Sequence, residues 1–274
     1  MILRRRSVQE INVCILQSDG TNCDVELHYA FKKAGGSPQF VHVNELRDST
    51  KILKDFQILA LPGGFSYGDD VASGKIWAIE LMSFLKNEIE NFRKKGGLII
   101  GICNGFQVLV RTGLLPFGNL GKMDVTLAPN DSGHFECRWI KLKTETHSTS
   151  SGQESKCVFL RDNKNIGWFS VNHGEGKFFS TPQIIKKVED ENLVVFRYVD
   201  ENGKLTQKYP QNPNGSLNAI AGVTDSTGRI LGMMPHPEKF VEATQYPNWR
   251  REKITKPHGA FIFEEMIKFV KGEL

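Results

Sequence analysis

Long apolar runs and a strong excess of charge of either sign are both missing from this 274-residue sequence. No stretch reaches the roughly 18 consecutive apolar residues of a transmembrane helix, so none is expected. The formal net charge is only +4, and the basic residues are scattered among acidic ones, apart from a cluster at residues 4–6. A charge this small and dispersed does not indicate a nucleic-acid-binding surface.

Cysteines are few and irregularly spaced. There are five, and they show neither a disulfide framework nor the paired spacing of a zinc site. A reducing compartment is therefore expected. The early apolar run "INVCILQ" is too short for the apolar region of a secretory signal, and no small-residue cleavage site follows it. These absences predict a cytoplasmic location.

Strand and helix patterns alternate through the first half of the chain. Strands are predicted at residues 11–17, 39–44, 56–64 and 96–103, with helices at residues 21–36 and 73–97. This alternation predicts an α/β fold with a mostly parallel central sheet and helices on both faces. Neither a repeat nor a linker interrupts the sequence, so a single domain over residues 1–274 is expected.

The second half of the chain is less regular. Antiparallel strands are predicted at residues 133–143 and 192–200, a hairpin at residues 220–238, and a terminal amphipathic helix at residues 259–274. The polar stretch at residues 144–155 is expected to be a mobile loop. The sequence thus predicts an antiparallel extension of the parallel sheet.

Cys103 lies in Gly101-Ile102-Cys103-Asn104-Gly105, where a buried strand gives way to a helix. This is the G-x-Nuc-x-G pattern of a nucleophile elbow. The dipole of the following helix is expected to lower the thiol pKa below its usual value of about 8.5. The pentapeptide alone also fits a small buried cysteine between strand-breaking glycines.

A thiolate nucleophile needs a base, and His236 is the best candidate among seven histidines. Prolines stiffen the chain on both sides of it, and Glu238 is close enough to orient its imidazole. Taken alone, this segment fits a surface turn better, and only its pairing with the elbow cysteine in one α/β chain favours the catalytic interpretation. The backbone N–H groups of Gly64 and Asn104 are expected to form an oxyanion hole at the carboxyl edge of the sheet. This set predicts acyl transfer from an amide or ester through a thioester.

Other residues and other protein classes offer alternatives to this interpretation. Cys23 also follows a strand, but it lacks flanking glycines and is interpreted as structural. Asp69 and Asp70 are interpreted as a solvated turn, and His173 as part of the pocket wall. DJ-1/PfpI-like proteins also carry an elbow cysteine, although they lack the His-Pro-Glu strand end. A catalytically silent binding subunit is the third class.

Six sequence blocks between residue 20 and about residue 240 resemble those of the class I, or triad, glutamine amidotransferases. They are "GTNCD", "PGGFSYGDD", "GICNGFQVL", "VNHGEGKF", "YPQNPNGS" and "MMPHPEK". Within that family they are most similar to the glutaminase subunits of phosphoribosylformylglycinamidine synthase. The resemblance implies a flavodoxin-like fold for nearly the whole chain.

The resemblance also implies roles for individual residues. Cys103 would attack the side-chain amide of glutamine, release ammonia and carry a γ-glutamyl thioester, with His236 as acid and base and Glu238 as its orienter. Gly64 and Asn104 would hold the oxyanion. The residues expected to bind the rest of the glutamine substrate are Gln107, Asn172, His173, Gly174 and Glu175.

Ammonia would pass to a separate synthetase subunit, and a small third subunit would bridge the two. No G-x-x-x-x-G-K-[ST] loop occurs in the sequence. ATP and magnesium are therefore expected on the synthetase, with no metal or cofactor in this chain. Residues 144–155 and 202–217 lengthen the chain, and one of these segments is expected to face the synthetase.

Overall fold

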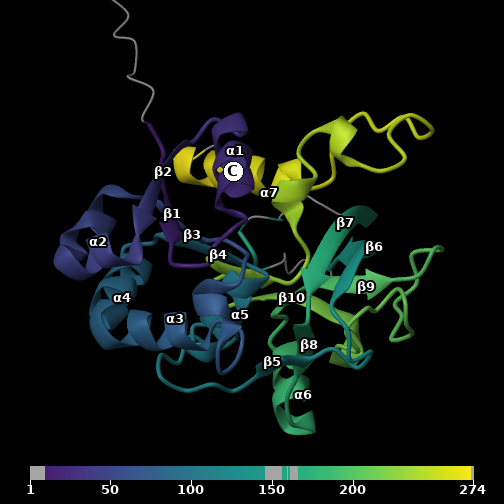
Figure 1. The fold of residues 1–274 in the computed structure, drawn as a ribbon, viewed down its shortest axis with the longest axis horizontal. Coiled ribbons are helices and arrows are strands. Elements are labelled where there is room, and N and C mark those ends of the chain that lie inside the picture. The colour runs from purple at the N-terminus through teal and green to yellow at the C-terminus, as the bar shows by residue number, and fades with distance from the viewer. Residues whose placement is uncertain (1–9, 146–155, 159, 161–165, 273–274) are drawn as a thin grey trace, which may run out of the picture.

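The central feature of the molecule is a nine-stranded sheet with strand order β2-β1-β3-β4-β11-β10-β9-β6-β7. The computed structural model describes residues 10–145, 156–158, 160 and 166–272 (Figure 1). The first five strands in this order are parallel to one another. They are β2 (Ser37–His42), β1 (Asn12–Gln17), β3 (Ile58–Leu61), β4 (Leu98–Ile102) and β11 (Ile230–Met233).

The other half of the sheet is antiparallel from β11 onward. Its strands are β10 (Ile220–Thr224), β9 (Val194–Val199), β6 (Glu136–Thr144) and β7 (Ile166–His173). A separate two-stranded sheet pairs β5 (Thr126–Pro129) with β8 (Glu175–Phe179). The predicted parallel sheet with an antiparallel extension is confirmed, while β5, β7 and β8 were not predicted.

Helices cover both faces of the parallel half (Figure 1). On one face α1 (Asp24–Lys33) lies against α7 (Ala260–Lys271), and on the other α3 (Lys75–Glu80) packs against α5 (Asn104–Arg111). The helix predicted at residues 73–97 consists of α3, a π-helical turn at Leu81–Leu85, and α4 (Lys86–Lys94). Two further helices, α2 (Val43–Asp48) and α6 (Pro182–Asp190), were not predicted.

The core explains why the central strands have continuous apolar sequences. Every residue of β3 and of β4 is buried, because helices cover both faces of these strands. No described helix is both long enough and apolar enough to cross a membrane. The predicted loop at residues 144–155 lies almost wholly outside the described residues.

The register of β4 and β11 determines where the functional residues meet. These strands are neighbours and parallel, with Ile102 opposite Met233. The residues that follow the two strands therefore emerge at the same carboxyl edge of the sheet, where open α/β folds bind ligands. Cys103 comes directly after β4, and His236 follows shortly after β11.

Candidate active site

Cys103 occupies a strained turn between β4 and α5. Its backbone has φ +52° and ψ −106°, a conformation that residues other than glycine rarely adopt. Two hydrogen bonds hold it there: its N–H donates to the Met233 carbonyl at 2.8 Å, and its carbonyl accepts from the Gln107 N–H at 3.0 Å. This is the geometry of the predicted nucleophile elbow.

The glycines on either side of Cys103 have a steric reason. A Cβ at Gly101 would lie 2.6 Å from the Gly105 carbonyl oxygen, and one at Gly105 would lie 2.1 Å from the Leu61 carbonyl oxygen. Both contacts are with backbone, which cannot give way as a flexible side chain can. The elbow therefore requires glycine at both positions.

His236 and Glu238 form a buried pair, each only 1% exposed. The His236 Nδ1 lies 2.5 Å from Glu238 Oε1, and the His236 backbone N–H donates to the Ser170 carbonyl at 2.9 Å. These contacts fix the ring and leave Nε2 without a hydrogen-bond partner among the described residues. Nε2 is thus available to exchange a proton with a reacting group.

The loop after β3 brings the imidazole and Cys103 to a common point. A Cβ built on Gly63 would lie 2.7 Å from His236 Cε1 and 3.4 Å from Cys103 Cβ. Only glycine leaves this space open. The structure therefore brings the predicted nucleophile, base and orienting acid together.

The pKa of the Cys103 thiol is raised, whereas the sequence predicted that it would be lowered. Burial raises the pKa of its thiol, and the charges of Cys23 and Glu238 add to that effect. The positive charge of Lys239 and a hydrogen bond from the Asn104 backbone N–H at the start of α5 oppose them only partly. The expected fall in pKa is wrong for the substrate-free chain, because loss of hydration outweighs the helix dipole. The thiol is neutral and donates to the Asn172 carbonyl at 3.5 Å.

The two predicted oxyanion donors have different surroundings. Asn104 directs its backbone N–H at the sulfur. Gly64 has φ +144° and pairs with Thr21, so the loop after β3 is pinned against the segment before α1. Their joint role in holding an oxyanion stays a prediction.

A buried amide network supports the elbow from the side of α5. Asn104 Nδ2 donates to Asp69 Oδ1 at 3.0 Å and to Gln107 Oε1 at 2.9 Å. Gln107 Nε2 donates in turn to the Glu175 carbonyl at 2.6 Å. Asp69 was interpreted as part of a solvated turn, but it is half-buried and bonded to the elbow. Only its place inside the "PGGFSYGDD" block could have signalled this.

The four residues predicted to recognise glutamine form the turn from β7 into β8. Burial lowers the pKa of His173 to about 3, so its imidazole is neutral, and its Nδ1 lies 3.1 Å from Asn130 Oδ1. Asn172 faces Cys103 through its carbonyl, and the Glu175 carboxylate lies 3.6 Å from an Arg111 nitrogen. The roles of Gln107 and of residues 172–175 in substrate binding stay predictions.

Cys23 lies closer to the chemistry than expected. It is buried at the start of α1. Its sulfur, a ring nitrogen of His236 and a carboxylate oxygen of Glu238 all lie within 4.8 Å of one another. The structural interpretation of this cysteine did not anticipate that contact. No spacing rule could have found it, because His236 is far away in sequence.

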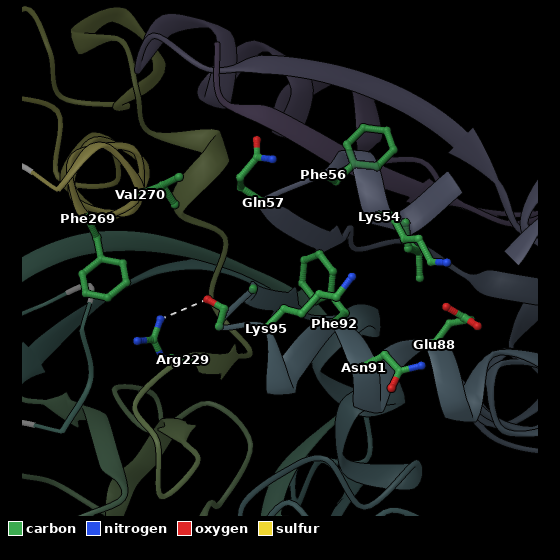
Figure 2. A pocket seen from close by; sticks show the side chains of 13 residues that line it. Lys54, Phe56, Gln57, Glu88, Asn91, Phe92, Lys95, Arg229, Phe269 and Val270 are labelled. Carbon is green, nitrogen blue, oxygen red and sulfur yellow. Dashed lines mark hydrogen bonds between the residues drawn. The ribbon is translucent and has the colours of Figure 1, made fainter. Parts of the chain in front are cut away.

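A pocket of about 540 Å³ lies at the opposite edge of the sheet, where β3, β4 and β11 begin. Figure 2 shows the aromatic rings of Phe56, Phe92 and Phe269 around it and Arg229 donating to the Gly96 carbonyl at 3.0 Å. None of the predicted site residues lines it. This pocket is therefore separate from the proposed chemistry.

The comparisons with known proteins decide the family. Residues 10–270 match the CobB/CobQ-like glutamine amidotransferase domain. The chain belongs to this family. It is 43% identical to "Phosphoribosylformylglycinamidine synthase subunit PurQ" of Dehalococcoides mccartyi, over 96% of this chain and 99% of that protein. It is 38% identical to the subunit of the same name from Archaeoglobus fulgidus, over 96% and 98% of the two chains.

A solved structure agrees with these relatives. A chain described as "Structure of PurLQS from Thermotoga maritima" is 28% identical and superposes with a TM-score of 0.69, covering 96% of this chain and all of that one. The sequence resemblance and the fold class are confirmed. The family match also excludes the DJ-1/PfpI-like alternative. As a glutamine amidotransferase, the chain is an enzyme.

Proposed function

We propose that the chain is the glutaminase subunit of a phosphoribosylformylglycinamidine synthase, working in the cytoplasm in purine biosynthesis. The observation that carries the chemistry is the meeting of the elbow cysteine after β4 with the His236–Glu238 pair after β11. The subunit assignment is supported by relatives of that name whose whole length this chain spans.

The first half of the reaction forms an acyl-enzyme. His236 Nε2 takes the proton from the Cys103 thiol, and the thiolate attacks the side-chain carbonyl carbon of glutamine. Backbone N–H groups of Asn104 and Gly64 stabilise the negative oxygen of the tetrahedral intermediate. The imidazolium then protonates the amide nitrogen, so ammonia leaves and a γ-glutamyl thioester remains.

The second half releases glutamate. Water loses a proton to His236 as it attacks the thioester, and the collapsing intermediate expels the Cys103 thiolate, which is reprotonated. Glu238 stays ionised throughout, holds the imidazole in one tautomer and stabilises its charged form. Because burial raises the pKa of the thiol, its proton has to pass to a base, and His236 is the base of this proposal.

The rest of the substrate would be held by the wall of the site. We propose that Gln107 and the turn formed by Asn172, His173, Gly174 and Glu175 contact the α-amino and α-carboxylate groups. Glutaminase chemistry of this kind needs no metal or cofactor in this chain. ATP and magnesium would act on the synthetase subunit, which receives the ammonia, and a small third subunit would bridge the two.

Glutamate release tests this function. It should be measured with the purified chain alone, then with its synthetase and bridging subunit, ATP and formylglycinamide ribonucleotide. Release that rises with the partners and produces the amidine in step would support the proposal. Release indifferent to the partners would leave a free-standing glutaminase and contradict the subunit assignment.

A further inference from the structure

The mechanism makes no use of Cys23, although this buried thiol lies against its machinery. Cys23 is only 6% exposed, and its backbone N–H donates to the Gly63 carbonyl at 3.2 Å. The same Gly63 separates it from the elbow, since a Cβ there would lie 3.4 Å from Cys23 Sγ. The thiol is thus fixed in the wall of the active site.

Two atoms of the His236–Glu238 pair lack hydrogen-bond partners. Among the described residues, neither Glu238 Oε2 nor His236 Nε2 has a hydrogen bond, and both are fully buried. Buried polar atoms without partners are costly, and they mark places where a ligand, water or ion is accommodated. The Cys23 thiol lies close to this pair.

The three side chains have the chemistry of a zinc site. A Cys sulfur, a His nitrogen and a Glu oxygen lie within 4.8 Å of one another. In a tetrahedral zinc site, bond lengths of about 2.0–2.3 Å separate neighbouring ligand atoms by roughly 3.5 Å. The atoms farthest apart would therefore move inward by about 1 Å, and His236 Nδ1 and Glu238 Oε1, now 2.5 Å apart, would separate if both bind the ion.

The charges also match. A Cys23 thiolate and the Glu238 carboxylate together balance a divalent cation, while the histidine binds as a neutral ligand. The thiolate selects a soft ion such as Zn²⁺ over Mg²⁺ or Ca²⁺, which prefer oxygen ligands. The ion must displace the Lys239 ammonium, which bonds the thiol, and a contact from the thiol to Asn22 Oδ1.

We propose that Cys23, His236 and Glu238 form an inhibitory binding site for Zn²⁺, with water as the fourth ligand. A bound ion withdraws His236 and Glu238 from proton transfer, so it blocks the glutaminase without being part of the reaction. The inhibition rests on the proposed function, whereas the binding does not.

The binding test uses the full-length chain in its reduced state. Co²⁺ serves as a probe because a cysteine ligand gives it a sulfur-to-metal charge-transfer band, and Zn²⁺ added afterwards displaces it. The Cys23→Ser variant should lose this band and bind Zn²⁺ at least about 100-fold more weakly, since even outer-shell changes cost 10–100-fold. Glu238→Gln should weaken binding while leaving Cys23 in place.

Variants of the other cysteines show whether the metal binds at Cys23 or at another thiol. Cys137→Ser removes an exposed thiol, and Cys103→Ser removes the nucleophile; both should keep the Co²⁺ band. A band that survives in Cys23→Ser, or that is lost in Cys103→Ser, would overturn the proposal. Circular dichroism of each variant confirms its fold, and Glu238→Gln provides a second test if Cys23→Ser is misfolded.

Activity supplies the functional readout. The ratio of glutaminase rates with and without Zn²⁺ should fall steeply in the wild-type chain and in Cys137→Ser, but little in Cys23→Ser. Equal inhibition of all three would contradict the proposed site. A chain that binds Zn²⁺ through Cys23 yet has no glutaminase activity would refute the proposed function and leave the metal site standing.

Discussion

Cys103 combines a buried, neutral thiol with a proposed role that requires a thiolate. Burial raises its pKa, so the strained elbow and the start of α5 do not ionise it by themselves. In the proposed mechanism, His236 activates the thiol as a general base, because its Nε2 accepts the thiol proton during the attack. At the residue scale, we therefore expect activity to depend on the pair as much as on the cysteine.

Replacing Cys103 by alanine should abolish glutamate release and leave the fold intact, because the change removes the nucleophile and few packing atoms. Coupled assay of glutamate and circular dichroism check this. Cys14→Ala is the matched control, since it deletes another buried thiol, in β1. If the Cys103→Ala variant kept glutaminase activity, Cys23 would have to be assigned as the nucleophile.

Replacing Glu238 by glutamine should lower kcat by up to about 10⁴-fold, less than loss of the cysteine or the histidine. The amide keeps the shape of the side chain but cannot stabilise the imidazolium. Glu242→Gln changes an exposed residue nearby and should retain activity. A Glu238→Gln enzyme as fast as the wild type would contradict the orienting role.

Elements position these residues through close backbone contacts. α5 approaches β3 so tightly that Gly105 has no room for a side chain. The loop after β3 is pinned to the start of α1, and His236 is bonded to β7. The site therefore depends on three strand ends and two helix starts being locked together.

Replacing Gly105 by alanine should destabilise the chain by about 3 kcal/mol or more, because the new Cβ would overlap a backbone carbonyl of β3. Urea unfolding measures the change. Gly174→Ala is the control for stability, since its Cβ would meet only Phe135 at 3.9 Å. Equal unfolding midpoints for the two variants would argue against tight packing at the elbow.

The sequence predicted most elements with strong periodicity, but it missed the strands set by distant pairing and the helices α2 and α6. The buried strands before Cys103 and His236 were predicted correctly, which placed both residues at one edge. The strands β7 and β8, which residues 172–175 connect, were not predicted, because each strand finds its partner far along the chain. Contacts such as Asp69 with Asn104, or Cys23 with His236, carry no local sequence signal.

At the scale of the whole molecule, the fold buries ionisable groups at some cost in acid stability. His173 is 2% exposed, and burial holds its pKa at about 3, below the unfolded value of about 6.5. The folded chain therefore keeps this histidine neutral, while the unfolded chain binds a proton below pH 6.5. Its contribution to stability is complete above pH 6.5 and is lost as the pH falls toward 3.

Replacing His173 by glutamine should flatten the acid side of the stability profile. Between pH 6 and 4 the free energy of unfolding of the wild-type chain should fall more steeply, by up to about 1.4 kcal/mol per pH unit. Urea unfolding at several pH values gives both slopes. Parallel slopes would show that His173 is not held neutral by the fold.

Both halves of the sheet serve one purpose at this scale. The parallel half presents Cys103 and His236 at its carboxyl edge, and the antiparallel half brings the Asn172 carbonyl to the sulfur.

The proposed mechanism depends above all on Cys103 being the nucleophile of this site. Labelling with an electrophilic analogue of glutamine, followed by peptide mass spectrometry, tests it most directly. We expect one modified residue, Cys103, and protection of it by glutamine. Modification of Cys23 in its place would contradict the assignment of Cys103 as the nucleophile.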